Sequence, residues 1–487
     1  MATSEAPMDR PGHRVVVSVL SGIGSSLIVA VLALVSVRLM TRRLGPTDYG
    51  LFVTALTFVT LAMFLTDLGV SSVAGREIAK NPEEAPHILG HNLGLRLTLS
   101  LALVPPLILL GLLLYRGSTA QLYWAIALIA LAVPFQSVRS VAAGFFVASI
   151  RNYLTAAIAV LNQLAYVIAL IVALYAHSGI VGCAAAYLFS TVIASAAAFF
   201  ITRREVEFRP RFNARRWRAV IGQSMSIGMI QIVNLIYLKA DTFLLSLMAS
   251  PHAVGLYGVA YVIIGFLTLG PGLLMVSLIP LIARAEDDEL ESLLRRAVAF
   301  LATVGVLVAC GAYLFAPAVV ELLAGPKFSG AVTPVRVLGV ACIFTYVNNA
   351  FGFAAFARNR HQRMLIVSLA GLVVNVASNI AVIPRFGIDG AAWATVGSEL
   401  VTLVGVYVVF RRDVGVRVSL VAPLVRPLVV GLVLCAVAQR FLSSGSRQGL
   451  EVLAYVPVVA IVYFGLLALL RGLPEDVVTG LRRISFR

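Results

Sequence analysis

The sequence predicts an all-α polytopic membrane protein with about fourteen transmembrane helices, which form two parallel six-helix repeats and two further C-terminal helices. Three observations lead to this prediction. Of the 487 residues, 60% are hydrophobic and only 12% are charged, a composition that soluble domains do not have. The charged residues lie mainly in short gaps between apolar runs of about twenty residues or more, which is the length that crosses a bilayer. In addition, the second half of the chain repeats the first.

The repeat consists of matched segments that occur in the same order in both halves. The offset between matched positions stays between 205 and 208 residues. The matched pairs are residues 46–55 with 251–260, 151–152 with 358–359, 179–186 with 387–394, and 203–204 with 411–412. Duplicated apolar halves are typical of membrane transporters that bind their substrate between the repeats.

The apolar spans give the domain organisation. They cover residues 14–40, 47–73, 91–115, 119–148, 152–175, 179–201, 218–248, 252–283, 297–320, 333–357, 362–384, 387–410, 419–441 and 449–470. The first six form an N-terminal bundle, residues 14–201, and the next six form a C-terminal bundle, residues 218–410. A cytoplasmic basic linker, residues 202–217, joins the bundles, and spans 13 and 14, residues 419–470, precede a tail at 471–487. Because six is an even number, the two repeats are parallel.

Lysine and arginine are concentrated in the loops on the N-terminal side of the spans. This distribution predicts that both termini lie in the cytoplasm and that the protein is a multi-pass protein of the cytoplasmic membrane. The segment 203–218 alone contains seven arginines together with Trp217. We expect this segment to lie along the inner membrane surface as a short amphipathic segment, with a lipid-binding patch as the alternative function.

Several classes of function are excluded by motifs that the sequence lacks. It has no phosphate-binding G-x-x-x-x-G-K-[ST] loop, so the chain does not hydrolyse ATP, and it has no catalytic-triad or metalloprotease motif. The four cysteines lie inside apolar runs without metal-ligand spacing. The net charge of +16 is explained by topogenic arginines and does not indicate nucleic-acid binding. We therefore expect a transporter with no cofactor and no metal.

Charged residues inside the spans are the main candidates for function, because a charge within a bilayer is costly unless it is paired or hydrated. The basic candidates outnumber the acidic ones, which predicts a cationic cavity for an anionic substrate. The candidate substrate-binding cations are Arg38, Arg96, Arg139, Lys239 and Arg426, and the candidate coupling acids are Asp67, Asp241 and Glu399. The alternatives are that Arg38, Arg96 and Arg426 extend to the membrane interface, that Asp67 pairs with Arg76 or Arg139, and that Glu399 belongs to a structural pair.

Amide side chains inside the spans are expected to line a polar cavity for a sugar-bearing substrate. The candidates are Asn162, Gln231, Asn234 and Asn375. Hydrogen bonding between helices is the alternative role for these amides. Glycine and proline at residues 270–272 predict a kink in the eighth span, which is either a hinge for alternating access or a static bend.

Three short motifs carry a family resemblance: Leu44-Gly45-Pro46-Thr-Asp48-Tyr49-Gly50-Leu51, Leu65-Thr-Asp67-Leu-Gly69 and Arg76-Glu77-Ile-Ala. The chain resembles the polysaccharide transporter branch, the O-antigen-type flippases, of the multidrug/oligosaccharidyl-lipid/polysaccharide exporter superfamily. The resemblance implies a fold like that of the multidrug and toxin extruders, with two six-helix bundles around a V-shaped cavity. It also implies that Asp241 occupies a recurrent acidic position of this branch. Related peptidoglycan-precursor flippases have essential arginines in the first span, where Arg38 is the corresponding candidate with a different spacing to Gly45.

Together, these features predict a flippase that moves polyprenyl-pyrophosphate-linked oligosaccharide to the outer leaflet by alternating access, for cell-surface polysaccharide biosynthesis. The expected partners are the lipid-linked glycan, membrane lipids and a polysaccharide polymerase or glycosyltransferase. A cation-coupled multidrug antiporter on the same fold is one alternative. A polytopic glycan-processing enzyme and a non-transporting scaffold for glycan assembly are the others.

Overall fold

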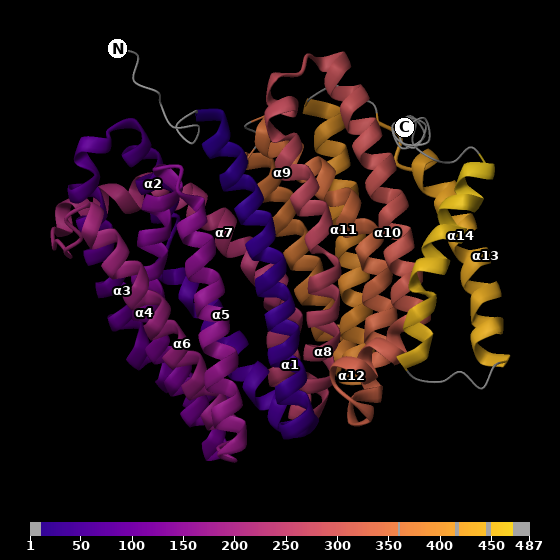
Figure 1. The fold of residues 1–487 in the computed structure, drawn as a ribbon, viewed down its shortest axis with the longest axis horizontal. Coiled ribbons are helices and arrows are strands. Elements are labelled where there is room, and N and C mark those ends of the chain that lie inside the picture. Colours follow the sequence, from indigo (N-terminus) through magenta and orange to yellow (C-terminus); the bar gives the residue numbers. More distant parts are fainter. Residues whose placement is uncertain (1–10, 359–360, 414–417, 445–449, 471–487) are drawn as a thin grey trace, which may run out of the picture. The chain divides into compact units, whose positions relative to one another are not determined.

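The computed structural model describes residues 11–358, 361–413, 418–444 and 450–470, and this part of the chain is almost entirely helical with no strand (Figure 1). The helices of the first half are α1 (Pro11–Met63), α2 (Val70–Lys80), α3 (Ala85–Leu114), α4 (Ala120–Ala148), α5 (Asn152–Tyr175) and α6 (Gly179–Glu205). Those of the second half are α7 (Ala214–Met248), α8 (Pro251–Leu267), α9 (Leu269–Arg284), α10 (Asp287–Leu323), α11 (Val332–Ala357), α12 (His361–Asp413), α13 (Ala422–Ser444) and α14 (Val456–Leu469). Short 3-10 turns occur at Phe64–Thr66, Pro82–Glu84, Pro326–Ala331 and Leu450–Tyr455.

The number of membrane crossings agrees with the prediction. Within the described residues, 12 helical segments are long and apolar enough to span a bilayer. Two of them, Gly24–Met63 with 40 residues and Gln362–Arg412 with 51, are each about twice the length that one crossing needs. Each contains one glycine with non-helical backbone, Gly45 or Gly387, where two helices meet at a kink. Counting both arms of each kinked helix gives about fourteen crossings.

The sequence repeat corresponds to a repeat of backbone geometry. Gly179 and Gly387, which match at an offset of 208, have φ angles of 57° and 56°. Glycine adopts this left-handed conformation without the steric penalty of a side chain. Three residues later, a methyl group on Gly182 or Gly390 would collide with the β-carbon of Ser178 or Phe386. The two halves therefore use the same glycines for the same turn.

One predicted span ends earlier than expected, and another contains the kink that its proline predicts. The span predicted at residues 47–73 leaves the helix at Met63, and a 3-10 turn, Phe64–Thr66, follows before α2 begins at Val70. Positive φ angles at Leu68 (46°) and Gly69 (77°) make this break. The span predicted at 252–283 has its break close to the kink predicted at residues 270–272: α8 and α9 meet at Thr268, because Pro271 has no amide hydrogen with which to continue the helical ladder.

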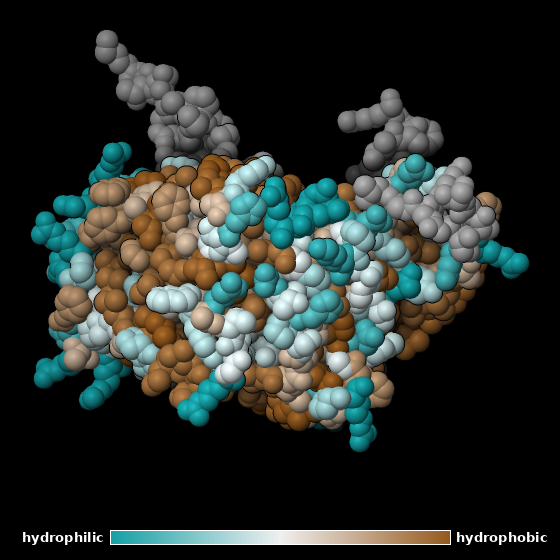
Figure 2. All heavy atoms as spheres, turned by 90° about the horizontal axis from the view of Figure 1, so that it is seen from below, coloured by the Kyte–Doolittle hydropathy of each residue, from teal (hydrophilic) through white to brown (hydrophobic). Residues whose placement is uncertain are grey.

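The chain forms two compact units, one ending at Lys239 and the other beginning at Ala240, so the division falls within α7. A core in the first unit contains Leu89, Leu93 and Phe146. In the second unit, α13 and α14 pack on α10, where the Tyr463 hydroxyl donates to the carbonyl oxygen of Thr303 at 3.0 Å. On the face shown in Figure 2, hydrophobic side chains cover broad areas of the surface, and hydrophilic side chains project from other parts of it. Exposed apolar surface of this extent suits contact with lipid.

The linker between α6 and α7 is shorter than predicted, and it has no helix of its own. Residues 206–213 are irregular and pack against the beginning of α3. The amide of Arg211 donates to the carbonyl oxygen of Gly90 at 2.8 Å, and Phe208 is completely buried in the core of the first unit. The segment is therefore fixed to the first unit by backbone and core contacts.

Candidate functional site

The break after α1 positions the first group of charged residues. Leu68 and Gly69 reverse the chain, and the amide of Val70 donates to the carbonyl oxygen of Asp67 at 2.8 Å. The turn lies so close to α7 that a methyl group on Gly69 would come within 2.6 Å of the amide nitrogen of Gly228. Because α3 packs against α2, this turn places Asp67 beside Arg96.

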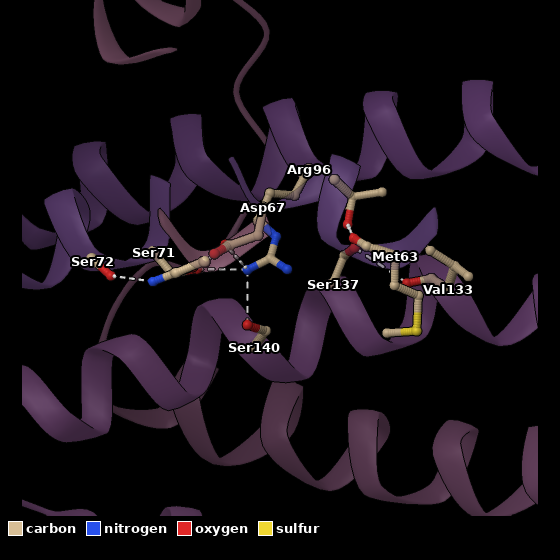
Figure 3. A network of polar contacts seen from close by, with 10 residues as sticks. Met63, Asp67, Ser71, Ser72, Arg96, Val133, Ser137 and Ser140 are labelled. Carbon is tan, nitrogen blue, oxygen red and sulfur yellow. Dashed lines mark hydrogen bonds and ion pairs between the residues drawn. The ribbon is translucent and has the colours of Figure 1, made fainter. Parts of the chain in front are cut away.

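Arg96 and Asp67 form a buried ion pair with several hydrogen bonds (Figure 3). The Arg96 Nη1 atom lies 2.8 Å from Asp67 Oδ1, and it donates to the hydroxyl oxygens of Ser71 at 2.6 Å and Ser140 at 2.8 Å. Ser71 in turn donates to Asp67 Oδ1 at 2.6 Å. The side chains of Arg96 and Asp67 are 6% and 17% exposed. Asp67 thus pairs with Arg96 and not with Arg76 or Arg139, and Arg96 does not extend to the interface.

A cavity of about 330 Å³ lies beside this ion pair, within the first unit, and we call it the charged cavity. Its polar lining comes from the turn after α1 and from α3, α4 and α5. The polar lining residues are Thr66, Asp67, Arg96, Gln136, Ser137, Arg139, Ser140 and Thr155. The volume is at the lower end of the range for sites that bind small molecules or head groups.

Arg139 supplies an unbalanced positive charge to the charged cavity. Among the residues that the structure describes, it has no ion pair or hydrogen bond, whereas Gln136 in the same lining donates a 2.7 Å hydrogen bond to the hydroxyl of Tyr187. The charges of Asp67 and Arg96 offset each other. Two further buried polar atoms, Arg96 Nε and Thr155 Oγ1, lack a partner within the described part of the chain. The cavity therefore has one net positive charge and unused hydrogen-bonding groups, an arrangement that suits an anion.

Asp241 is the centre of a second polar site, in the second unit. Its carboxylate is 3% exposed and accepts hydrogen bonds from residues of α7, α8 and α12. The Tyr257 hydroxyl donates to Oδ2 at 2.6 Å, the Thr395 hydroxyl donates to the same oxygen at 3.4 Å, and the Thr242 amide donates to Oδ1 at 2.8 Å. A buried carboxylate with these neutral donors can hold a proton or a small cation.

The polar contacts continue from Asp241 along α12. Ser398 donates to the carbonyl oxygen of Thr395 at 3.0 Å and accepts from Asn375 at 3.1 Å. One turn from Thr395, Glu399 accepts a 2.8 Å hydrogen bond from Asn348 of α11. Asn375 is 2% exposed, so this amide joins the two arms of α12 and does not line an open surface.

The other candidate residues lie outside these two sites. Arg38, Arg426 and Asn234 are exposed, and Lys239 is half-buried. Gln231 donates to the Ser72 hydroxyl at 3.3 Å, which is a contact between α7 and α2. Asn162 is half-buried on α5, and its Oδ1 atom lacks a partner in the described part of the chain. The structure thus brings together Asp67, Arg96 and Arg139 in one site, and Asp241, Asn375 and Glu399 along the polar contacts of the other.

Sequence reasoning missed the hydroxyl groups at both sites. Ser71, Ser140 and Thr395 carry no signal in sequence, since such residues are frequent in transmembrane helices. Tyr257 could have been found from the repeat, because its matched position at an offset of 205 is Phe52. Both rings are buried, so the hydroxyl is the difference between the halves.

Comparisons with known proteins place this geometry in context. The family model described as polysaccharide biosynthesis protein matches residues 15–286, more than half of the chain. A solved structure of the lipid II flippase MurJ in an inward closed conformation is 13% identical, with a TM-score of 0.79, and the match covers 94% of this chain and 99% of that one. No match was found among curated proteins.

Multidrug transporters share the fold as well. An inward-facing multidrug resistance MATE family transporter of the MOP superfamily is 17% identical with a TM-score of 0.62, and the match covers 85% of this chain and 96% of that one. A MOP superfamily transporter from Pyrococcus furiosus is 16% identical with a TM-score of 0.58, and the match covers 88% of this chain and 95% of that one. Identities this low indicate a common fold.

Proposed function

The chain belongs to the polysaccharide biosynthesis protein family, and we propose that it is a flippase for polyprenyl-pyrophosphate-linked oligosaccharide. It moves this substrate from the cytoplasmic to the outer leaflet of the cytoplasmic membrane by alternating access. Both termini lie in the cytoplasm in this proposal. The family membership and the helical membrane fold support a transporter of a lipid-linked substrate.

The observation that carries the proposal is the charge of the cavity in the first unit. Arg139 faces the cavity beside an ion pair that is already neutral, so the cavity favours an anionic group. Guanidinium groups bind phosphate oxygens with two parallel hydrogen bonds. Arg139 therefore recognises the pyrophosphate. The side chain of Arg96 is held in the cavity wall by its contacts with Asp67, Ser71 and Ser140.

Net transport in one direction requires coupling to an energy source, and Asp241 is the candidate group. Its buried carboxylate accepts hydrogen bonds from donors on three helices, where binding of a proton or a sodium ion would change the charge that α7, α8 and α12 share. Glu399, at 2.8 Å from the Asn348 amide, is the second candidate. Ion binding in the second unit would favour one of the alternating states.

A cation-coupled multidrug antiporter is the second candidate function, and the buried Asp241 favours it. Such a protein would use the same acid for coupling, but its substrate site would be acidic or aromatic, because organic cations bind carboxylates and ring faces. The net positive charge of the cavity beside Arg139 favours the flippase.

The test is reconstitution of the full-length protein in liposomes with a fluorescent polyprenyl-pyrophosphate oligosaccharide. Leaflet exchange is measured by the loss of fluorescence when a membrane-impermeant quencher is added. We expect exchange that requires the protein. Absence of exchange for several glycans, together with ion-driven efflux of a cationic dye, would establish the antiporter instead.

A further inference from the structure

We call residues 203–218 the basic strap; they comprise the end of α6, the irregular residues 206–213 and the first turn of α7. The basic strap contains seven arginines and two glutamates. A cytoplasmic loop needs only a few basic residues to fix orientation. The structure gives these arginines a fixed position and an aromatic neighbour.

Backbone contacts hold the basic strap on α3. The Trp217 indole donates to the carbonyl oxygen of His91 at 3.2 Å, and the Arg211 amide donates to the carbonyl oxygen of Gly90. A methyl group on Gly90 would lie 2.8 Å from the carbonyl oxygen of Arg209. A methyl group on Gly94 would overlap the carbonyl oxygen of Arg211. The strap can approach α3 this closely only because both positions are glycine.

The outward side of the basic strap combines exposed cations with an exposed aromatic ring. Phe212 is 69% exposed, and its ring packs against Trp217 with 6.0 Å between centroids. Arg215 and Arg218 are exposed, lie three residues apart on one face of α7, and have no ion pair among the residues that the structure describes. The Asn213 side chain accepts a hydrogen bond from the Arg216 amide at 3.2 Å, so the first turn of α7 is capped and these arginines are held in place.

The two acidic side chains of the basic strap itself are already engaged. Glu207 pairs with Arg209 at 4.0 Å and with Arg211 at 3.4 Å, and Glu205 pairs with Arg151. The positive charge of Arg215 and Arg218 is therefore left for an external partner. Tryptophan and phenylalanine side chains are typical of the membrane–water interface, and adjacent basic residues attract anionic head groups.

We infer that the basic strap is a docking surface for anionic phospholipid of the cytoplasmic leaflet, with Arg215 and Arg218 on the head groups and the exposed Phe212 ring at the level of the glycerol backbone, while Trp217 lies beside Phe212 and against α3. Bound lipid would fix the beginning of α7, the helix in which the division between the two units falls. The occupant is a lipid surface, because the exposed Phe212 ring needs an apolar environment that a soluble polyanion does not offer.

The test uses tryptophan fluorescence in the full-length protein. The chain has three tryptophans, so the double variant Trp124→Phe/Trp393→Phe leaves Trp217 as the single reporter. This protein is placed in phosphatidylcholine vesicles that contain the same mole fraction of brominated phosphatidylglycerol or brominated phosphatidylcholine. We expect brominated phosphatidylglycerol to quench Trp217 with an apparent enrichment of about fivefold or more, which corresponds to the attraction of one basic residue.

In the same background, Arg215→Gln/Arg218→Gln should remove most of this preference, and so should high salt, which screens exposed charges. Both arginines are exposed, so the substitutions do not disturb the core. The matched control is Arg116→Gln, an exposed arginine after the other end of α3, which should keep the preference. Equal quenching by the two lipids, or a preference that the double variant retains, would overturn the inference.

Discussion

The surroundings of Arg96 indicate a structural role and not a role in binding the substrate. A buried guanidinium in a membrane is tolerated when a carboxylate and further acceptors surround it, as Asp67, Ser71 and Ser140 do here. Its role is to balance the charge of Asp67 and to shape the wall of the charged cavity. Arg139, three residues along α4 from Gln136, has no such partners among the described residues and is the group left for a ligand.

Substitution of Asp67 by asparagine should leave Arg96 buried without its counter-charge. We expect Asp67→Asn to lower the free energy of unfolding by about 3–5 kcal/mol, the usual cost of breaking one side of a buried pair. Chemical unfolding of the purified protein in detergent measures this loss. The double variant Asp67→Asn/Arg96→Gln should recover part of it, whereas a single variant as stable as the wild type would show that the pair carries little energy.

Removal of the Tyr257 hydroxyl should destabilise the protein and alter the role of Asp241 in coupling. Tyr257→Phe keeps the ring, which fits because Phe52 occupies the matched position of the first half, but it removes the 2.6 Å hydrogen bond to Asp241. We expect a loss of about 1.5–3 kcal/mol in the free energy of unfolding, since the lost hydrogen bond is short and its acceptor is a buried carboxyl group. We also expect the dependence of leaflet exchange on an imposed proton or sodium gradient to change. If neither quantity moves, Asp241 is not the coupling group.

The charged residues of the site could be named from sequence, but their contacts could not. A charge within an apolar span is conspicuous, so Asp67, Arg96, Arg139 and Asp241 were all predicted. The pairing of Asp67 with Arg96 depends on the chain reversal at Leu68 and Gly69, and the sequence there reads as a continuation of the span. Hydroxyl partners such as Ser140 and Thr395 were missed for a related reason, because short polar side chains are common in membrane helices.

Helix α3 connects the charged cavity to the basic strap. Arg96 lies near the beginning of this helix. Gly90 and Gly94, which precede it, lie in close contact with the backbone of the strap. Two glycines in the interior of a helix reduce its intrinsic stability, and the close packing of the strap offsets this cost. The position of Arg96 therefore depends on how residues 206–213 pack.

The substitution of Gly94 by alanine, which adds one methyl group, tests the packing of the strap on α3. Gly94→Ala would overlap the carbonyl oxygen of Arg211, and we expect it to lower the free energy of unfolding by about 1–3 kcal/mol through overpacking. Gly222→Ala is the matched control in α7, where nothing lies within 4 Å, and it should be neutral or stabilising by up to about 1 kcal/mol. Thermal unfolding of both variants makes the comparison. Equal melting temperatures would mean that the strap can move away from α3.

Helix positions were predictable because apolar runs of this length have few alternatives to a membrane helix. The breaks were less predictable. The kinks at Gly45 and Gly387 followed from the predicted gaps between spans, and glycine and proline at 270–272 indicated the junction of α8 and α9. The end of α1 at Met63 was missed, because residues 64–69 are apolar enough to continue a span.

At the scale of the whole molecule, the two halves share the turn at Gly179 and Gly387 but differ in their charges. The second half has Asp241 and Tyr257 where the first half, at an offset of 205, has Ser36 and Phe52. The first half has Arg139 beside a cavity, and the second has the buried acid. This difference supports the proposal that one half binds the anionic substrate while the other couples transport to an ion.

The most direct measurement compares leaflet exchange of a fluorescent polyprenyl-pyrophosphate oligosaccharide by the wild type, Arg139→Gln and Arg116→Gln in the same liposomes. Loss of a hydrogen-bonded charge on the pyrophosphate should slow exchange by Arg139→Gln about tenfold or more. Arg116→Gln, which changes an exposed arginine that does not line the charged cavity, should exchange at the wild-type rate. Equal rates for all three proteins would contradict the claim that Arg139 holds the substrate.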